Sequence, residues 1–230
     1  MIPFLIYILF KRHSTKNWEV TRLQINKFFR IHFYIIFCSL LVLLFLIPIL
    51  STAQHQQLNY KIVQGGDDIG WLRLEKYIAG NRSNLLLISE IKTRILFLIT
   101  VSAKELSTYE NGKLIYSSQF RKTNGSTKLD KQTRFAANKY EVLENGERIN
   151  LSIPFIGTNL LSLYFQEPLG ITQVYCDNYK CFTGVTKMVD GGYKVKFPDG
   201  NSNRFYYNRG VCTKVKISHT FYSAEIILKS

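Results

Sequence analysis

Most of the sequence alternates between apolar and polar residues with a period of two. In Tyr193 to Phe197 ("YKVKF") the odd positions are apolar and both even positions are lysine. In Val211 to Ile217 ("VCTKVKI") the same alternation predicts that Cys212 lies with Lys214 and Lys216 on the polar face of a strand. Strict alternation is typical of half-buried β-strands, so the sequence predicts a mainly β fold.

Short turn sequences separate these alternating stretches. Asn-Gly and Asp-Gly pairs supply the positive φ angles that tight hairpins require, and short connections make neighbouring strands antiparallel. We therefore expect about ten or more consecutive strands. The apolar segment from Ser83 to Ser107 is long enough for two strands or for one strongly bent strand. The turn signals are Gln64–Asp68, Gly80–Asn81, Glu110–Gly112, Glu144–Gly146, Asp190–Gly192, Pro198–Asn201 and Asn208–Gly210.

One stretch departs from the period of two. Between Thr158 and Gln166 the apolar residues recur at offsets of three and four, and Pro168 follows as a stop signal. This pattern predicts a short helix capped by Thr158, with its apolar side against a sheet. The expected fold is a curved antiparallel sheet or incomplete β-barrel with one short covering helix.

An N-terminal segment precedes the predicted β domain. An uncharged apolar run from Phe33 to Leu50 follows Lys27 and Arg30, and small residues lead to Ala53. These are the parts of a secretory signal, with cleavage between Ala53 and Gln54. The alternative is an uncleaved signal anchor, for which the run is just long enough. We predict a leader or anchor at 1–53 and one exported domain at 54–230.

The charge of the chain bears on its partners. The sequence has 30 Lys and Arg against 16 Asp and Glu, and most of this excess follows residue 53. Because both interpretations of the leader place that domain outside the cytoplasm, in the periplasm or cell envelope, we expect no nucleic-acid partner. An anionic membrane surface is the expected electrostatic partner, although an ordinary solvated surface has a similar balance.

The cysteines and histidines give little indication of catalysis. Cys176 and Cys181 bracket a four-residue hairpin loop, which makes a disulfide between them a candidate and two reduced thiols the alternative. The spacing of Cys176, Cys181, Cys212 and His219 is loose for zinc, so no metal or cofactor is predicted. With few histidines and no phosphate-binding glycine loop, we expect no enzyme activity.

Aromatic and aliphatic residues provide the candidate binding site. Most aromatic residues belong in the core of a β protein, but a curved sheet with one helix often leaves an apolar concavity at its mouth. The residues expected to line it are Trp71, Phe97, Ile99, Leu161, Tyr164 and Phe165.

Four segments carry a resemblance to a known family. They are Tyr60–Lys76 ("YKIVQGGDDIGWLRLEK"), Tyr109–Ser118 ("YENGKLIYSS"), Leu163–Pro168 ("LYFQEP") and Phe197–Ile217 ("FPDGNSNRFYYNRGVCTKVKI"). Together they resemble exported bacterial proteins grouped as domain of unknown function 6134, a family with no assigned activity. That pattern is in turn similar to lipoprotein carriers, in which an incomplete antiparallel barrel closed by helices holds acyl chains. This second likeness is one of fold.

Two functions from different classes are consistent with these features. The leading hypothesis is a non-enzymatic envelope protein that binds an apolar or lipid-like ligand inside the curved sheet. The alternative is a structural module without a ligand cavity, which binds a protein or polysaccharide of the cell envelope.

Overall fold

The structure is a computed structural model that describes residues 32–34, 36–39, 54–94, 98–153, 155–220 and 222–229. The chain divides into two units, Met1–Ser51 and Thr52–Ser230. In the first unit the described residues are helical, and the rest of the predicted leader, with Ala53 of its cleavage site, lies outside the described residues. No helix within the described ranges has the length and apolar character needed to span a membrane.

The second unit consists of consecutive β-strands and one short 3₁₀ helix, η1. The helix covers Leu160–Tyr164. The strands are β1 (Gln54–Gln64), β2 (Asp67–Ala79), β3 (Arg82–Arg94), β4 (Leu98–Glu110), β5 (Lys113–Thr123), β6 (Ser126–Ala136), β7 (Lys139–Glu144), β8 (Glu147–Leu151), β9 (Gln173–Cys176), β10 (Cys181–Lys187), β11 (Tyr193–Lys196), β12 (Ser202–Asn208), β13 (Val211–Ser218) and β14 (Ser223–Leu228).

Within the described residues, all fourteen strands form one antiparallel sheet that does not close into a barrel. Its order is β8-β7-β6-β5-β4-β3-β2-β1-β14-β13-β12-β11-β10-β9, so the first and last strands of the chain pair in the middle. The edges β8 and β9 are consecutive in sequence, and the segment that joins them contains η1. This arrangement confirms the predicted curved, incomplete barrel with one covering helix.

Asn-Gly turns connect the hairpins as their sequences predict. Asn111 and Gly112, between β4 and β5, have φ angles of 51° and 73°. A two-residue turn with positive φ at both positions matches the right-handed twist of the flanking strands. The long apolar segment from Ser83 to Ser107 forms two strands, because β3 ends at Arg94 and β4 begins at Leu98.

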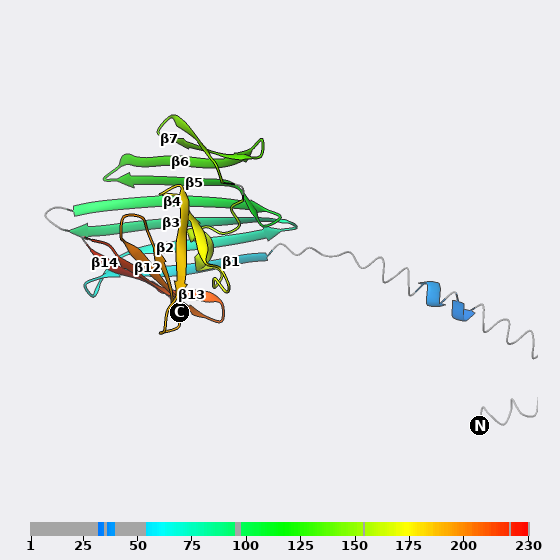
Figure 1. Ribbon diagram of the computed structural model, residues 1–230. Helices are drawn as coiled ribbons and strands as arrows, with labels where there is room; N and C mark the ends of the chain where they lie inside the picture. Colours follow the sequence, from blue (N-terminus) through cyan, green and yellow to red (C-terminus); the bar gives the residue numbers. More distant parts are fainter. Residues whose placement is uncertain are drawn as a thin grey trace, which may run out of the picture. The chain divides into compact units, whose positions relative to one another are not determined.

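The core lies on the inner face of the sheet, around η1. In β2 and β3 alternate residues are buried, among them Leu74 and Leu87, while their sequence neighbours are more exposed. The helix contacts β3, β9 and β13, and in Figure 1 the yellow segment that contains it lies in front of the long strands. The ring of Tyr164 packs edge-on against Tyr60 and Phe205. The helical segment therefore fills the interior between the two walls of the sheet.

The predicted boundaries and cap of the helix are wrong. The helix begins at Leu160, and its cap is Asn159 instead of Thr158. The Asn159 side chain accepts a hydrogen bond from the Ser162 backbone N–H at 3.2 Å, and the Ser162 hydroxyl lies 3.5 Å from the Asn159 backbone N–H. This reciprocal capping box favours Asn159 as the start of the helix.

The predicted exposure of Cys212 is also wrong. Cys212 is fully buried, and its backbone carbonyl accepts a hydrogen bond from the hydroxyl of Tyr60 at 2.7 Å. The register between β12 and β13 shifts, because Tyr206 pairs with Lys214 and Tyr207 pairs with Cys212. Such a bulge inserts one residue and reverses the alternation, which turns Cys212 inward.

Gly70 lies where the backbone of β3 comes close to that of β2. A Cβ atom at Gly70 would lie 2.2 Å from the Glu90 backbone oxygen, whereas one at Gly184 in β10 would meet nothing within 4 Å. We predict that Gly70→Ala lowers the free energy of unfolding by about 2 kcal/mol, the usual range for overpacking. Gly184→Ala should change it by less than about 0.5 kcal/mol. Urea denaturation measures both, and equal effects would contradict the assigned strand contact.

Candidate functional site

The inner face of the sheet changes from apolar to polar along one row of cross-strand neighbours. The row starts with Leu58, Leu74 and Leu87 on β1, β2 and β3. It then continues on β4 to β7 with polar residues: Leu87 pairs with Glu105, Glu105 with Gln119, Gln119 with Lys131, and Lys131 with Glu144. The candidate site lies in this polar half of the interior.

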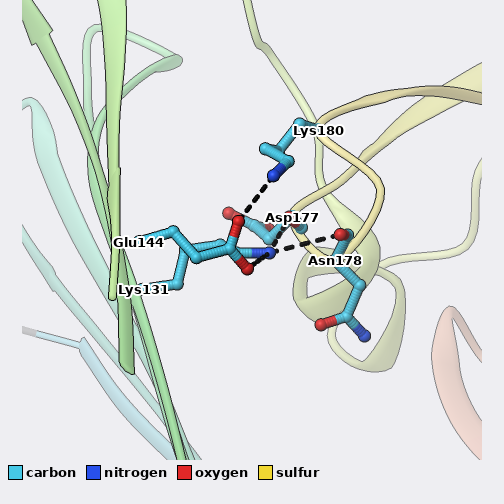
Figure 2. A network of polar contacts seen from close by, with 5 residues as sticks. All are labelled: Lys131, Glu144, Asp177, Asn178 and Lys180. Carbon is cyan, nitrogen blue, oxygen red and sulfur yellow. Dashed lines mark hydrogen bonds and ion pairs between the residues drawn. The ribbon is translucent and has the colours of Figure 1, made fainter. Parts of the chain in front are cut away.

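The tip of the β9–β10 hairpin packs against these strands and forms a polar cluster with them. We define the polar cluster as Ser117, Lys131, Glu144, Asp177 and Lys180. Glu144 accepts ion pairs from Lys131 at 2.9 Å and from Lys180 at 2.5 Å. Lys131 also donates to the backbone carbonyl of Asp177 at 3.3 Å, and Figure 2 shows this lysine between Glu144 and the hairpin. The cluster therefore joins the two ends of the open sheet through side chains.

The carboxylate of Asp177 is held by two donors from other elements. The Ser117 hydroxyl donates to one oxygen at 2.5 Å, and the Asn159 amide donates to the other at 3.2 Å. Burial nevertheless raises the pKa of Asp177 above its ordinary value, although Ser117, Asn159 and the Lys131 ammonium act in the opposite direction. Asp177 is thus a desolvated acid in a prearranged hydrogen-bonding site.

Glu105 is a second acid with a raised pKa on the same inner face. Burial is the main cause, and the negative charge of Asp177 adds to it. The Arg121 guanidinium and a hydrogen bond with Gln119 act in the opposite direction. Acids with raised pKa occur at functional sites and also in buried ion-pair networks that hold a fold together.

One buried polar atom near these acids has no hydrogen-bond partner among the described residues. It is Oε1 of Gln119, a residue that is 7% exposed. Most buried polar groups in folded proteins are paired, so unpaired ones indicate a missing partner. Within the described part of the chain, no group of three or more His, Cys, Asp or Glu residues is arranged to hold a metal ion.

The structure brings three of the predicted pocket residues together. Leu161, Tyr164 and Phe165 lie in and directly after η1 and are 3%, 8% and 7% exposed. They pack into the apolar core with residues from both walls of the sheet. These three side chains therefore contribute to the packing of the interior.

The other predicted pocket residues lie elsewhere. Ile99 is half-buried on β4 and points to the same inner face as Ser107, whereas Trp71 is 39% exposed and lies on the opposite face from Leu72. Phe97 lies outside the described residues. Trp71 is therefore separated from the residues of η1 by the sheet itself.

Cys176 and Cys181 face each other across the β9–β10 hairpin. They are cross-strand partners, and both are free thiols in the structure. Cys176 is buried, and burial raises its pKa to about 11, so little of it is thiolate at neutral pH. The disulfide between them stays a prediction.

Lys131 and Asp177 are the residues that the sequence analysis missed. The segment Arg121–Gln132 is strongly polar, which is typical of a basic loop or mobile hairpin, yet it contributes to β5 and β6. One signal was present: Lys131 has the same parity as the apolar Leu129 and Phe135, which places it on their face. Asp177 lies in a turn, where Asp is common for local reasons, and its sequence gives no comparable signal.

Replacing Lys131 tests the contribution of the polar cluster to stability. We predict that Lys131→Met lowers the free energy of unfolding by about 2 kcal/mol, because the Asp177 carbonyl loses a buried donor and Glu144 keeps one cation. The control is Lys92→Met, which removes an ion pair with Glu90 whose side chains are 62% and 37% exposed. The control should lose less than about 0.5 kcal/mol. Similar losses in urea denaturation would show that the cluster is of little importance.

The pH dependence of stability tests the charge state of Glu144. Burial raises the pKa of Glu144, but the ammonium groups of Lys180 and Lys131 outweigh it and hold the pKa below the ordinary value of 4.5. Because the pKa of Glu144 is lowered in the fold, its ionised carboxylate contributes its full stabilisation above pH 4.5. This contribution is lost as the pH falls below that value. The wild-type protein should therefore have a higher free energy of unfolding than Glu144→Gln, and the difference should be largest at neutral pH. A difference that stays constant down to pH 3 would be inconsistent with this assignment.

Comparisons with known proteins identify the family. The family model described as Domain of unknown function (DUF6134) matches residues 60–229. No curated protein matches the chain. No solved structure matches it either. The match covers nearly all of the strand-forming unit and confirms the resemblance in the sequence, so the chain belongs to the DUF6134 family.

Proposed function

We propose that this protein is a non-enzymatic protein of the cell envelope that binds an apolar or lipid-like ligand on the concave face of its sheet. The observation that supports the proposal most directly is an apolar strip on that face whose side chains are only partly buried. We define the open strip as Ile91, Ile99, Val101, Ala103 and Leu129.

The open strip is inward-facing but only partly buried. Ile91 has the parity of the buried Leu87 on β3, and Val101 and Ala103 have that of Ser107 on β4. Ile91 and Val101 are direct cross-strand partners. All five residues have intermediate exposure, in contrast to the fully buried residues around η1. Apolar surface on a concave face is stabilised by an apolar ligand that removes it from water.

The strip adjoins charged residues, which suits an amphiphile better than a plain hydrocarbon. Ala103 pairs with Arg121 on β5, and Arg121 pairs with Leu129 on β6. Glu105 follows two residues after Ala103 on the same face of β4. A tail along the strip would thus have its polar end beside Arg121 and Glu105.

The proposed location outside the cytoplasm is supported by the apolar run after Lys27 and Arg30, which has the features of a secretory signal or anchor. The excess of Lys and Arg favours approach to an anionic membrane surface, where an amphiphile could be exchanged. The absence of enzyme activity is part of the same proposal.

The packing of η1 favours the second candidate, an interaction module without a ligand. The side chains of Leu161, Tyr164 and Phe165, which the sequence predicts to line an apolar concavity, are instead buried in the core. The edge strand β8 is largely exposed and presents unpaired backbone groups to which an extended partner could bind. This candidate predicts that changes on the open strip have no effect on binding to the partner.

A charge on the open strip separates the two candidates. We predict that Val101→Lys weakens the binding of a fluorescent apolar dye at least about tenfold, because the ammonium group is buried against the ligand. The matched control is Ser102→Lys, which adds the same charge on the opposite face of β4. Fluorescence titration of both variants and wild type measures the effect. Equal dye affinities, or no dye binding by wild type, would contradict the ligand-binding proposal.

A further inference from the structure

We infer that Gln119, together with Glu105 and Arg121, forms the site for the polar head group of the ligand, and that this head group is an uncharged hydrogen-bond donor such as a hydroxyl or an amide. The inference rests on the proposed function and names the chemical class of its ligand.

The first observation is the unused acceptor of Gln119. The side chain lies on the inner face of β5 and the residue is only 7% exposed. Its amide is engaged with the carboxyl group of Glu105, while Oε1 has no donor within hydrogen-bonding distance. A buried acceptor without a partner is unfavourable, and a bound donor relieves this.

The second observation is the position of Gln119 between the open strip and the polar cluster. Its cross-strand partners are Glu105 on one side and Lys131 on the other. Two residues further along β5 lies Arg121, which pairs with Ala103 and Leu129 of the open strip. A ligand whose tail covers the strip therefore has its head within reach of Gln119.

The charges around the site favour a neutral head group. Each carboxyl group near the site has a cation acting on it: Arg121 on Glu105, Lys131 on Asp177, and Lys131 with Lys180 on Glu144. Lys131 and Lys180 already bind Glu144, and Asp177 already accepts from Ser117 and Asn159. A charged head would leave an unmatched buried charge, whereas a hydroxyl or amide N–H adds only the missing donor.

Two probes of equal chain length test the inference in the wild-type protein. Dodecanol carries a hydroxyl donor, and dodecyl methyl ether has the same tail without one. We expect dodecanol to displace a fluorescent apolar dye about tenfold more tightly than the ether, as expected for a buried hydrogen bond. Equal displacement by the two probes would overturn the head-group assignment and leave the ligand-binding function intact. Displacement by neither probe would overturn both.

A pair of variants locates the donor site. Gln119→Met keeps the length of the side chain but removes the amide, and should abolish the preference for dodecanol over the ether. The control is Gln132→Met on the outer face of β6, where the Gln132 Oε1 accepts from Arg134. This variant should keep the preference. Loss of the preference in both variants, or in neither, would overturn the assignment to Gln119. The wild-type comparison decides the head-group chemistry even if Gln119→Met fails to fold.

Discussion

Among the strands that the structure describes, the two edges of the sheet, β8 and β9, do not pair with each other, and the rest of the structure depends on how they are joined. Where backbone hydrogen bonds would close a barrel, the polar cluster connects β5, β6 and β7 to the tip of the β9–β10 hairpin. A sheet joined by a few directional side-chain contacts leaves the open strip of its concave face partly exposed, whereas a fully paired barrel would enclose it. Lys131 and Asp177 are buried because they lie where these strands and the hairpin meet.

The interior has two halves with different chemistry. Around η1 the rings of Tyr60, Tyr164 and Phe205 pack at edge-to-face geometry and exclude solvent. On β3, β4 and β6 the inward-facing residues of the open strip are only half-buried. Charged residues adjoin this strip. The first half stabilises the fold, and the second offers an apolar surface next to an unsatisfied acceptor, which is the arrangement that an amphiphile complements.

The fold could be predicted from local patterns because alternation and Asn-Gly turns are local properties. The same patterns failed where a long-range contact decides the outcome. The bulge in β13 that buries Cys212 depends on the register with β12, and the burial of Lys131 depends on a hairpin more than forty residues away. Trp71 is aromatic like Tyr164, but the alternation along β2 places it on the opposite face from the buried Leu72, a local property of the sequence. The alternation along β4 is enough to identify Val101 and Ala103 as inward-facing residues. Only the structure shows that they are partly exposed.

The central claim is that the concave face holds an amphiphile with an uncharged, hydrogen-bond-donating head. Mass spectrometry of organic extracts, from protein purified out of its native cell envelope without detergent, tests it most directly. We predict one main class of co-purifying molecule, with an apolar tail and a hydroxyl or amide head, in near-stoichiometric amount. Extracts without any bound amphiphile, or with only fully apolar or charged species, would contradict it.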